Sequence, residues 1–148
     1  MKALFSIVAV TVLLFGQCGE NEVFIGEDRF TLKEGEVYDA GSFKLRLSGI
    51  DDSRCPVNAN CVWQGAAVTA LTLWMESKGD LPQDTLKTCL GGCKQMGIPG
   101  DRPESIGFQV DGNQYEVILE EVSPYPDAKT KGDVPEKEAS YLLRSFSE

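Results

Sequence analysis

Cysteine is the residue type with the greatest capacity for chemistry in this chain of 148 residues, which contains five cysteines and no histidine. The absence of imidazole excludes Ser-His-Asp and Cys-His nucleophile pairs, and it also excludes histidine metal ligands. Two pairs lie close together in sequence, Cys55 with Cys61 and Cys89 with Cys93. Their spacing decides between metal binding, redox chemistry and structural disulfides.

The spacing of these pairs argues against the first two roles. Structural zinc sites use cysteines separated by about two to four residues, so the Cys55–Cys61 spacing is too wide. Thioredoxin-like chemistry requires C-x-x-C at the start of a helix, whereas CLGGC has one residue too many. We therefore expect structural disulfides and neither a metal nor another cofactor. The cysteines permit more than one connectivity, which the sequence does not distinguish, and we favour the two local pairs.

The segment DDSRCPVNANCVWQG, residues 51–65, carries most of the polar groups around the first pair. Its Asp and Asn spacing does not match a calcium loop, which needs D-x-[DN]-x-[DN]-G and a bidentate Glu. We expect Asp52 to accept backbone N–H bonds in an Asx-type turn, with Arg54 as its ion-pair partner. Trp63 is expected in the core, with packing over a disulfide or under Arg54 as alternatives. No catalytic residue is predicted.

The balance of charges limits the classes of partner. Lys and Arg number 14 against 23 Asp and Glu, which gives a net charge of −9. No basic stripe is available to neutralise nucleic-acid phosphates, so a nucleic-acid partner is not expected. Electrostatic attraction to anionic lipid headgroups is disfavoured for the same reason.

The N-terminal segment is typical of an export signal. Lys2 precedes an apolar run from Ala3 to Gly16, which is too short to span a bilayer as a helix and matches the core of a signal peptide. We predict a signal-peptide helix within residues 1–17, before the folded domain.

Cys18 follows this segment in the sequence LFGQC, which resembles a bacterial lipobox. A lipobox cysteine is acylated and becomes the mature N-terminus; Gly16 fits that pattern and Gln17 does not. Acylation of Cys18 also accounts for the odd thiol, because the other cysteines can then pair completely. We expect residues 18–22 to be a lipidated tether that attaches a single domain, residues 23–148, to a membrane. The alternative is a soluble periplasmic or secreted protein.

Alternating hydrophobicity predicts an all-β domain. Residues 43–49, FKLRLSG, alternate between apolar and polar side chains, as in a half-buried strand. Residues 61–75 are apolar on both faces and suit a central strand. Residues 105–122 give a hairpin signal around Asp111 and Gly112, and residues 139–146 resemble a closing strand. We predict an antiparallel β-sandwich or partly open barrel of about seven to nine short strands.

Two segments are expected to lie outside this framework. Residues 76–104 are polar and rich in Gly and Pro, and residues 123–137 contain three prolines. Both compositions are typical of extended loops.

The sequence DSRCPVNANCVWQG resembles the D-S-R-C-P-x(n)-C-x-W-x-G signature of small bacterial envelope lipoproteins and hypothetical proteins. In that group a P-Y-P segment follows a strand near the C-terminus, and here Pro124-Tyr125-Pro126 follows YEVILEEV. The resemblance implies an exported β-domain with Cys55 paired to Cys61 and without an assigned activity. The second cysteine pair lies outside the pattern. The matching positions are Asp52, Ser53, Arg54, Cys55, Pro56, Cys61, Trp63 and Gly65.

The expected function is binding or structural support in the bacterial cell envelope. The membrane is one partner, through the N-terminal lipid, and the 51–61 and 123–137 loops are candidate surfaces for an envelope protein. One alternative is a secreted hydrolase that uses carboxylates such as Asp51 and Asp52. Glu120 and Glu121 are expected to point to opposite faces of a strand, which disqualifies them as a pair. Another alternative is a soluble periplasmic protein with a redox or metal role for its cysteines.

Overall fold

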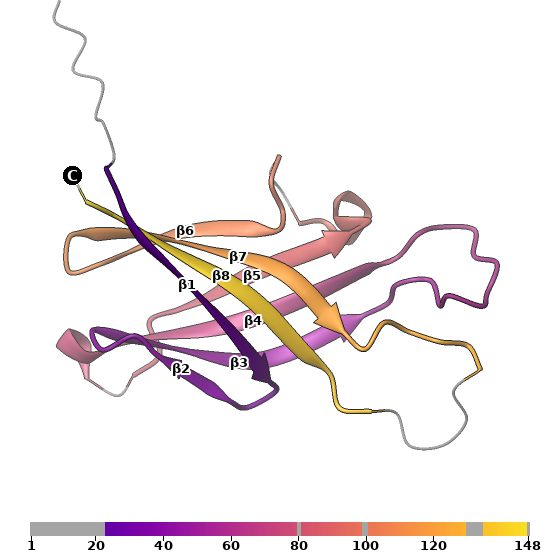
Figure 1. Ribbon diagram of the computed structural model, residues 1–148, viewed down its shortest axis with the longest axis horizontal. Helices are drawn as coiled ribbons and strands as arrows, with labels where there is room; N and C mark the ends of the chain where they lie inside the picture. The colour runs from indigo at the N-terminus through magenta and orange to yellow at the C-terminus, as the bar shows by residue number, and fades with distance from the viewer. Residues whose placement is uncertain (1–22, 80, 99–100, 130–134, 148) are drawn as a thin grey trace, which may run out of the picture.

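Two antiparallel four-stranded sheets make up the part of the chain that the computed structural model describes, residues 23–79, 81–98, 101–129 and 135–147. The strand orders are β1-β8-β7-β6 and β2-β3-β4-β5, and the sheets pack face to face (Figure 1). The predicted all-β antiparallel sandwich is confirmed. Its elements are β1 (Val23–Lys33), β2 (Val37–Asp39), β3 (Phe43–Asp52), β4 (Ala66–Met75), the 3-10 helix η1 (Glu76–Lys78), β5 (Asp84–Gly91), the 3-10 helix η2 (Cys93–Met96), β6 (Ser105–Val110), β7 (Asn113–Ser123) and β8 (Glu138–Ser147).

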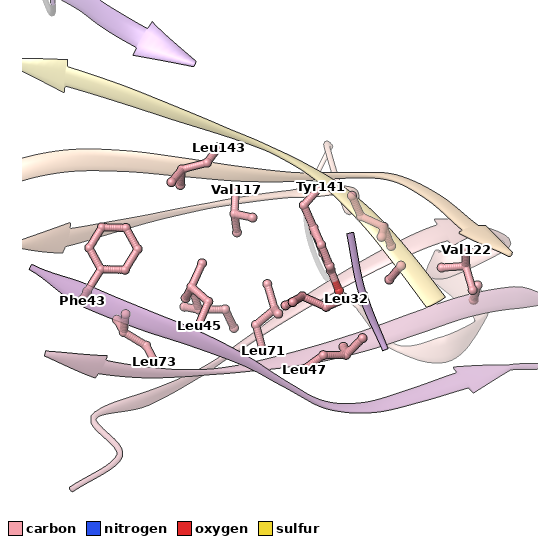
Figure 2. Packing of buried hydrophobic residues seen from close by; sticks show 14 of the residues in the cluster. Leu32, Phe43, Leu45, Leu47, Leu71, Leu73, Val117, Val122, Tyr141 and Leu143 are labelled. Carbon is pink, nitrogen blue, oxygen red and sulfur yellow. The ribbon is translucent and has the colours of Figure 1, made fainter. Parts of the chain in front are cut away.

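Side chains from both sheets fill the space between them. The predicted alternation of residues 43–49 is confirmed, because Phe43, Leu45 and Leu47 on β3 are at most 1% exposed. They belong to one cluster with Val117 and Tyr141 from the other sheet (Figure 2). Burial of each Leu or Phe side chain contributes about 1.5–3 kcal/mol, so this cluster is the main source of stability.

The predicted hairpin is present as β6 and β7, joined by Asp111 and Gly112. Both turn residues have positive φ, 48° and 85°, as a two-residue type I′ turn requires. The predicted central strand over residues 61–75 begins only at Ala66, and it lies between β3 and β5 as expected.

The expectation that residues 76–104 form only loop is wrong, because they contain β5. This strand pairs with β4 along its whole length. Leu86 and Thr88 point into the sandwich, and the Thr88 hydroxyl hydrogen-bonds the Thr69 hydroxyl of β4 at 2.8 Å. A polar residue therefore occupies a core position and weakens the alternation that would identify the strand.

The two ends of the sandwich carry different segments. β1 begins at Val23, which pairs with Ser147 at the end of β8, and the β6–β7 turn lies at this same end. The opposite end holds the connections from β3 to β4, β5 to β6 and β7 to β8 (Figure 1). We call residues 53–65 the first loop and residues 124–137, described at 124–129 and 135–137, the second loop.

The predicted signal peptide, residues 1–17, and tether, residues 18–22, lie outside the described residues. Within the ranges that are described, no helix has both the length and the apolar character that crossing a bilayer requires. Two disulfides are present, Cys55–Cys61 and Cys89–Cys93. Disulfides are typical of an oxidising, exported compartment.

Tyr141 offers a test of the core. Its side chain is 0% exposed, and its hydroxyl makes no hydrogen bond to the described residues. Burial raises the pKa of Tyr141. The Thr69 hydroxyl offsets part of that rise, but it does not form a hydrogen bond with the Tyr141 hydroxyl. An unsatisfied buried hydroxyl costs about 1–3 kcal/mol. Tyr141→Phe is therefore expected to leave the free energy of unfolding unchanged or to raise it.

Tyr38→Phe is the matched control, because the Tyr38 hydroxyl donates a hydrogen bond of 2.7 Å to Asp28. Its loss is expected to lower the free energy of unfolding by about 0.5–1 kcal/mol. Urea unfolding of both variants measures the difference. A larger loss for Tyr141→Phe than for Tyr38→Phe contradicts the description of Tyr141.

Candidate functional site

A buried carboxylate, Asp52, lies where β3 enters the first loop. Its side chain is 0% exposed and accepts two hydrogen bonds of 2.8 Å from the guanidinium of Arg54. Lys137, at the end of the second loop, donates a third hydrogen bond of 2.6 Å. The backbone N–H of Arg54 donates at 3.3 Å, as expected for an Asx-type turn. The predicted pairing of Asp52 with Arg54 is therefore present, and it is bidentate.

The surroundings of Asp52 keep its carboxylate ionised. Burial alone raises the pKa of a carboxyl group, but the hydrogen bonds from Arg54 and Lys137 outweigh that effect and lower the pKa of Asp52 below its ordinary value of 3.8. An ionised carboxylate that is fully paired is a poor general acid. Asp51, its neighbour on β3, is exposed, so the two carboxylates do not converge on one substrate.

Arg54 connects the first loop to the opposite sheet. One guanidinium nitrogen donates a hydrogen bond of 2.7 Å to the carbonyl oxygen of Val122, near the end of β7. The guanidinium also lies over the ring of Tyr125, 4.2 Å from the ring centroid. This cation–π contact adds to the two bonds on Asp52. Lysine lacks the planar fork that makes all these contacts simultaneously.

Further hydrogen bonds join the two loops directly. The backbone N–H of Val57 donates to the carbonyl oxygen of Pro126 at 3.0 Å. The side-chain amide of Asn58 donates to Asp127 at 2.7 Å. The backbone N–H of Lys129 and the Asn58 amide together lower the pKa of Asp127. The first loop and the described part of the second loop therefore form one continuous surface.

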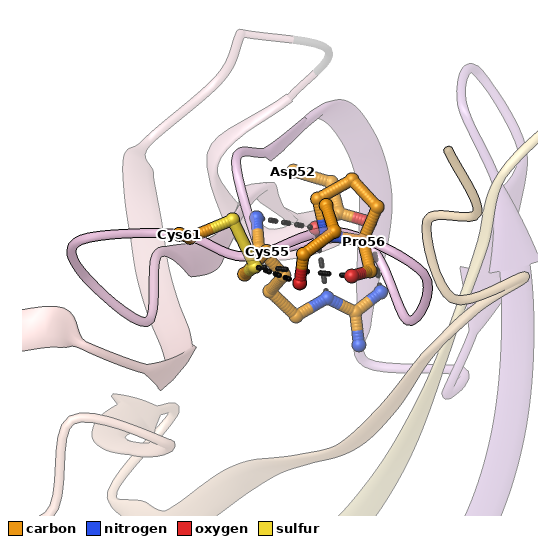
Figure 3. The surroundings of a disulfide bond; sticks show 6 residues. Asp52, Cys55, Pro56 and Cys61 are labelled. Atoms are coloured by element: carbon orange, nitrogen blue, oxygen red, sulfur yellow. Dashed lines mark hydrogen bonds and ion pairs between the residues drawn. A yellow bond between two sulfur atoms is a disulfide. The ribbon is translucent and has the colours of Figure 1, made fainter.

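The Cys55–Cys61 disulfide closes the first loop beside Asp52 and Pro56 (Figure 3). The N–H of Cys55 donates to the carbonyl oxygen of Gln64 at 2.9 Å, so the base of the loop extends the pairing of β3 with β4. A ring this small contributes about 2 kcal/mol on the loop-entropy model, so its main effect is to restrict the shape of the loop.

Gly65 permits a close backbone approach at the base of the first loop. Its φ is +71°, and a Cβ there would lie 2.0 Å from the Ser53 carbonyl oxygen. Its own carbonyl oxygen accepts a hydrogen bond of 2.8 Å from the N–H of Gly92. Gly92 directly precedes η2, where the buried Cys89–Cys93 disulfide closes a second ring. The ring closed by the second disulfide is therefore hydrogen-bonded to the base of the first loop.

Large apolar side chains project from both loops. Val57, Val62 and Trp63 in the first loop are 64%, 103% and 43% exposed, and Tyr125 in the second loop is 48% exposed. The expectation that Trp63 lies in the core is wrong. The guanidinium of Arg54 stacks on Tyr125. The Trp63 side chain is therefore partly open to solvent.

Lys137 is the residue of this site that sequence reasoning missed. It is one of several lysines in a polar segment rich in proline, and only the fold brings it to Asp52. Tyr125 was indicated only by its place in the P-Y-P segment. Ser53, a position of the signature, has a backbone role, because its N–H and its hydroxyl both donate to the carbonyl oxygen of Ala66.

A second carboxylate pair, Glu120 and Glu121, differs from expectation. A β-bulge in β7 shifts the register between Leu119 and Glu121, so both glutamates are exposed on one face rather than on opposite faces. They line a solvent-open hollow with Arg29, whose guanidinium lies 3.4 Å from Glu120. The expectation of opposite faces is wrong. Both side chains nevertheless stay in solvent, whereas a carboxylic general acid is typically enclosed by apolar groups.

The chain matches no protein-family model, no curated protein and no solved structure. Among the described residues, no group of three or more acidic or cysteine side chains is arranged to hold a metal ion. The site consists of two loops that are joined by hydrogen bonds and an ion pair and that carry exposed apolar side chains.

Asp52→Asn tests the charge cluster. The variant leaves Arg54 and Lys137 without an anionic partner, and breaking a buried ion pair costs about 3–5 kcal/mol. We expect a loss of about 3 kcal/mol in the free energy of unfolding, because the Lys137 side chain is 24% exposed and regains water readily. Asp51→Asn, on the adjacent exposed residue, is expected to change stability little. Equal effects of the two substitutions in non-reducing urea unfolding contradict the account.

The lowered pKa of Asp52 also predicts a dependence on pH. A carboxyl group whose pKa is lower in the folded state contributes stability above its unfolded pKa and loses it as the pH falls through the folded pKa. The stability difference between the wild type and Asp52→Asn is therefore constant at neutral pH and shrinks as the pH falls below 3.8. Urea unfolding as a function of pH measures it, and a difference that grows on acidification contradicts the prediction.

Proposed function

We propose that this chain is a lipid-anchored domain of the bacterial cell envelope that binds an envelope protein through its two joined loops. The observation that supports this most directly is the set of exposed apolar side chains on the loops, Val57, Val62, Trp63 and Tyr125. Apolar side chains gathered in one region of a surface are typical of interaction sites. Trp and Tyr are also the residue types that most often dominate binding energy in interfaces.

The cross-links between the loops favour binding. Ordering a mobile loop during association costs free energy, and a loop that is ordered beforehand avoids that cost. Here the Cys55–Cys61 disulfide closes the first loop before a partner arrives. The ion pair of Asp52 with Lys137 and the hydrogen bond from Val57 to Pro126 join it to the second loop. The apolar side chains are therefore presented in a defined arrangement.

The position of the loops agrees with anchoring at the N-terminus. Val23, where β1 begins, lies at the end of the sandwich opposite to both loops (Figure 1). An acylated Cys18 precedes Val23 by only a few residues. In this arrangement the loops face away from the membrane, where a partner in the envelope can reach them.

Kinship with the envelope lipoproteins that carry the D-S-R-C-P-x(n)-C-x-W-x-G signature remains part of this proposal. The two segments that carry the resemblance are far apart in sequence, yet they touch: Arg54 of the signature stacks on Tyr125 of P-Y-P. A shared pair of motifs is expected where residues depend on each other in space.

Site-specific photo-crosslinking tests the binding role. A photoreactive amino acid at Val62, which is 103% exposed in the first loop, is expected to give discrete adducts in intact cells. The same amino acid at Leu81, which is 71% exposed at the opposite end of the sandwich, serves as the control. Adducts that appear equally from both positions, or from neither, count against a binding surface at the loops.

Replacement of Cys18 tests the anchor. Cys18→Ser is expected to move the protein from the membrane fraction to the soluble fraction, because it removes the site of acylation. The wild-type protein, extracted in detergent and kept non-reduced, is expected to have the mass of a chain that begins at an acylated Cys18 and has no alkylatable thiol. An unlipidated wild-type mass contradicts the anchor but leaves the loop surface to be judged by crosslinking.

A further inference from the structure

The outer face of the second sheet, β2-β3-β4-β5, carries a separate group of side chains. The register of β3 and β4 places Lys44 opposite Trp74 and Arg46 opposite Thr72. These four side chains share the face that points away from the core, because Leu45 between them points inward and is 0% exposed. This face is distinct from the loop surface described above.

Two adjoining hollows open on this face. A hollow of about 460 Å³ is lined by residues that include Val37 and Lys44, and a hollow of about 420 Å³ by residues that include Ser48. Arg46 and Trp74 line both hollows and lie at their junction. We call the two hollows together the Trp74 groove. Each is comparable in size to a small-molecule site, and both are open to solvent.

The charge of the groove is opposite to that of the whole molecule. Its described lining holds two cations, Lys44 and Arg46, and one carboxylate, Glu76, in a chain of net charge −9. Lys44 lies 3.5 Å from Asp39. Arg46 forms no ion pair with any residue that the structure describes. Its guanidinium therefore retains the donors with which arginine binds carboxylate or phosphate groups.

We propose that the Trp74 groove binds an acidic oligosaccharide. A sugar ring has a face of C–H groups that packs on a flat aromatic ring, and the indole of Trp74 is only partly buried. Arg46 beside it supplies a planar fork for the acidic group of the sugar. The hydroxyls of Ser48 and Thr72, which hydrogen-bond each other, lie next to Trp74 and match sugar hydroxyls in donor and acceptor character.

The combination of groups favours this ligand over simpler ones. A small inorganic anion would use Arg46 but would gain nothing from Trp74. A neutral sugar would use Trp74 but would leave Arg46 without a counter-charge. Two hollows on either side of one aromatic residue suit successive sugar units of a chain, since each hollow accommodates a unit next to the shared residues.

Tryptophan fluorescence provides a direct readout. The chain contains two tryptophans, so a Trp63→Phe background leaves Trp74 as the single indole reporter. Trp63 is exposed in the first loop, and its replacement leaves the groove intact. Titration with hexagalacturonate is expected to change the Trp74 emission in a saturable manner, and added salt is expected to weaken the binding. Maltohexaose, a neutral α-1,4-linked chain of the same number of sugar units, is expected to bind more weakly.

Two charge-matched substitutions locate the interaction. Arg46→Gln is expected to weaken hexagalacturonate binding about tenfold or more, as the loss of a charge-assisted hydrogen bond predicts. Lys87→Gln is the control, because Lys87 is exposed on β5 of the same sheet but does not line the groove. It removes the same charge and is expected to leave the affinity unchanged. Circular dichroism of both variants establishes that the fold is retained.

The other outcomes overturn the proposal in distinguishable ways. No saturable change with hexagalacturonate, or equal affinity in Arg46→Gln and Lys87→Gln, means that the groove is not the site. Equal binding of maltohexaose means that charge is not recognised. Full competition by inorganic phosphate at equal ionic strength means that the groove is an anion site only. Crosslinking at Val62 tests the loop surface and Trp74 fluorescence tests the groove, so either proposal can be refuted without the other.

Discussion

The arrangement of the two loops depends most on the burial of one ionised carboxylate, Asp52. Asp52 is withdrawn from water, so its oxygens need donors from the protein, and they find them in Arg54 and Lys137. Asp52 belongs to the β2-β3-β4-β5 sheet, whereas Lys137 directly precedes β8 of the other sheet. Arg54 also donates a hydrogen bond to Val122 of β7, in that other sheet. Satisfying this single charge therefore requires both sheets and both loops to be in place. It joins the sandwich at one end in the way that apolar packing joins it at the centre.

The features around this charge follow from the same requirement. Bidentate bonding uses the edge of the Arg54 guanidinium, which leaves a face of the guanidinium free for the ring of Tyr125. The backbone at position 65 passes close to Ser53, and glycine is needed there because a Cβ would collide with the Ser53 carbonyl oxygen. With the polar groups engaged beneath the surface, apolar side chains such as Val62 are left outside. The result is a loop surface with paired polar groups below and exposed apolar side chains above, and the proposed binding role rests on this arrangement.

Sequence patterns predicted the parts of this arrangement that depend on neighbours in the chain. The alternation in β3, the Asp111–Gly112 turn and the Asp52–Arg54 pair are local, and all three are present. The features that the sequence did not predict depend on the fold rather than on neighbours in the chain. Lys137 and Tyr125 meet Arg54 and Asp52 only after both sheets form. The bulge that turns Glu120 and Glu121 to one face is a backbone irregularity. In β5 a threonine, Thr88, rather than an apolar residue occupies a core position, where it pairs with Thr69 of β4.

The central claim is that the Asp52 cluster holds the two loops together, and hydrogen exchange tests it most directly. The Val57 amide, bonded to Pro126 across the loops, reports on the contact, and the Gln83 amide, bonded to Leu73 at the other end of the sandwich, is the reference. Lys137→Gln removes one donor to Asp52 while the bidentate bonds from Arg54 remain. The account predicts faster exchange at Val57 in this variant and unchanged exchange at Gln83. Unchanged exchange at Val57 would contradict it, because the loops would then be held together without the charge.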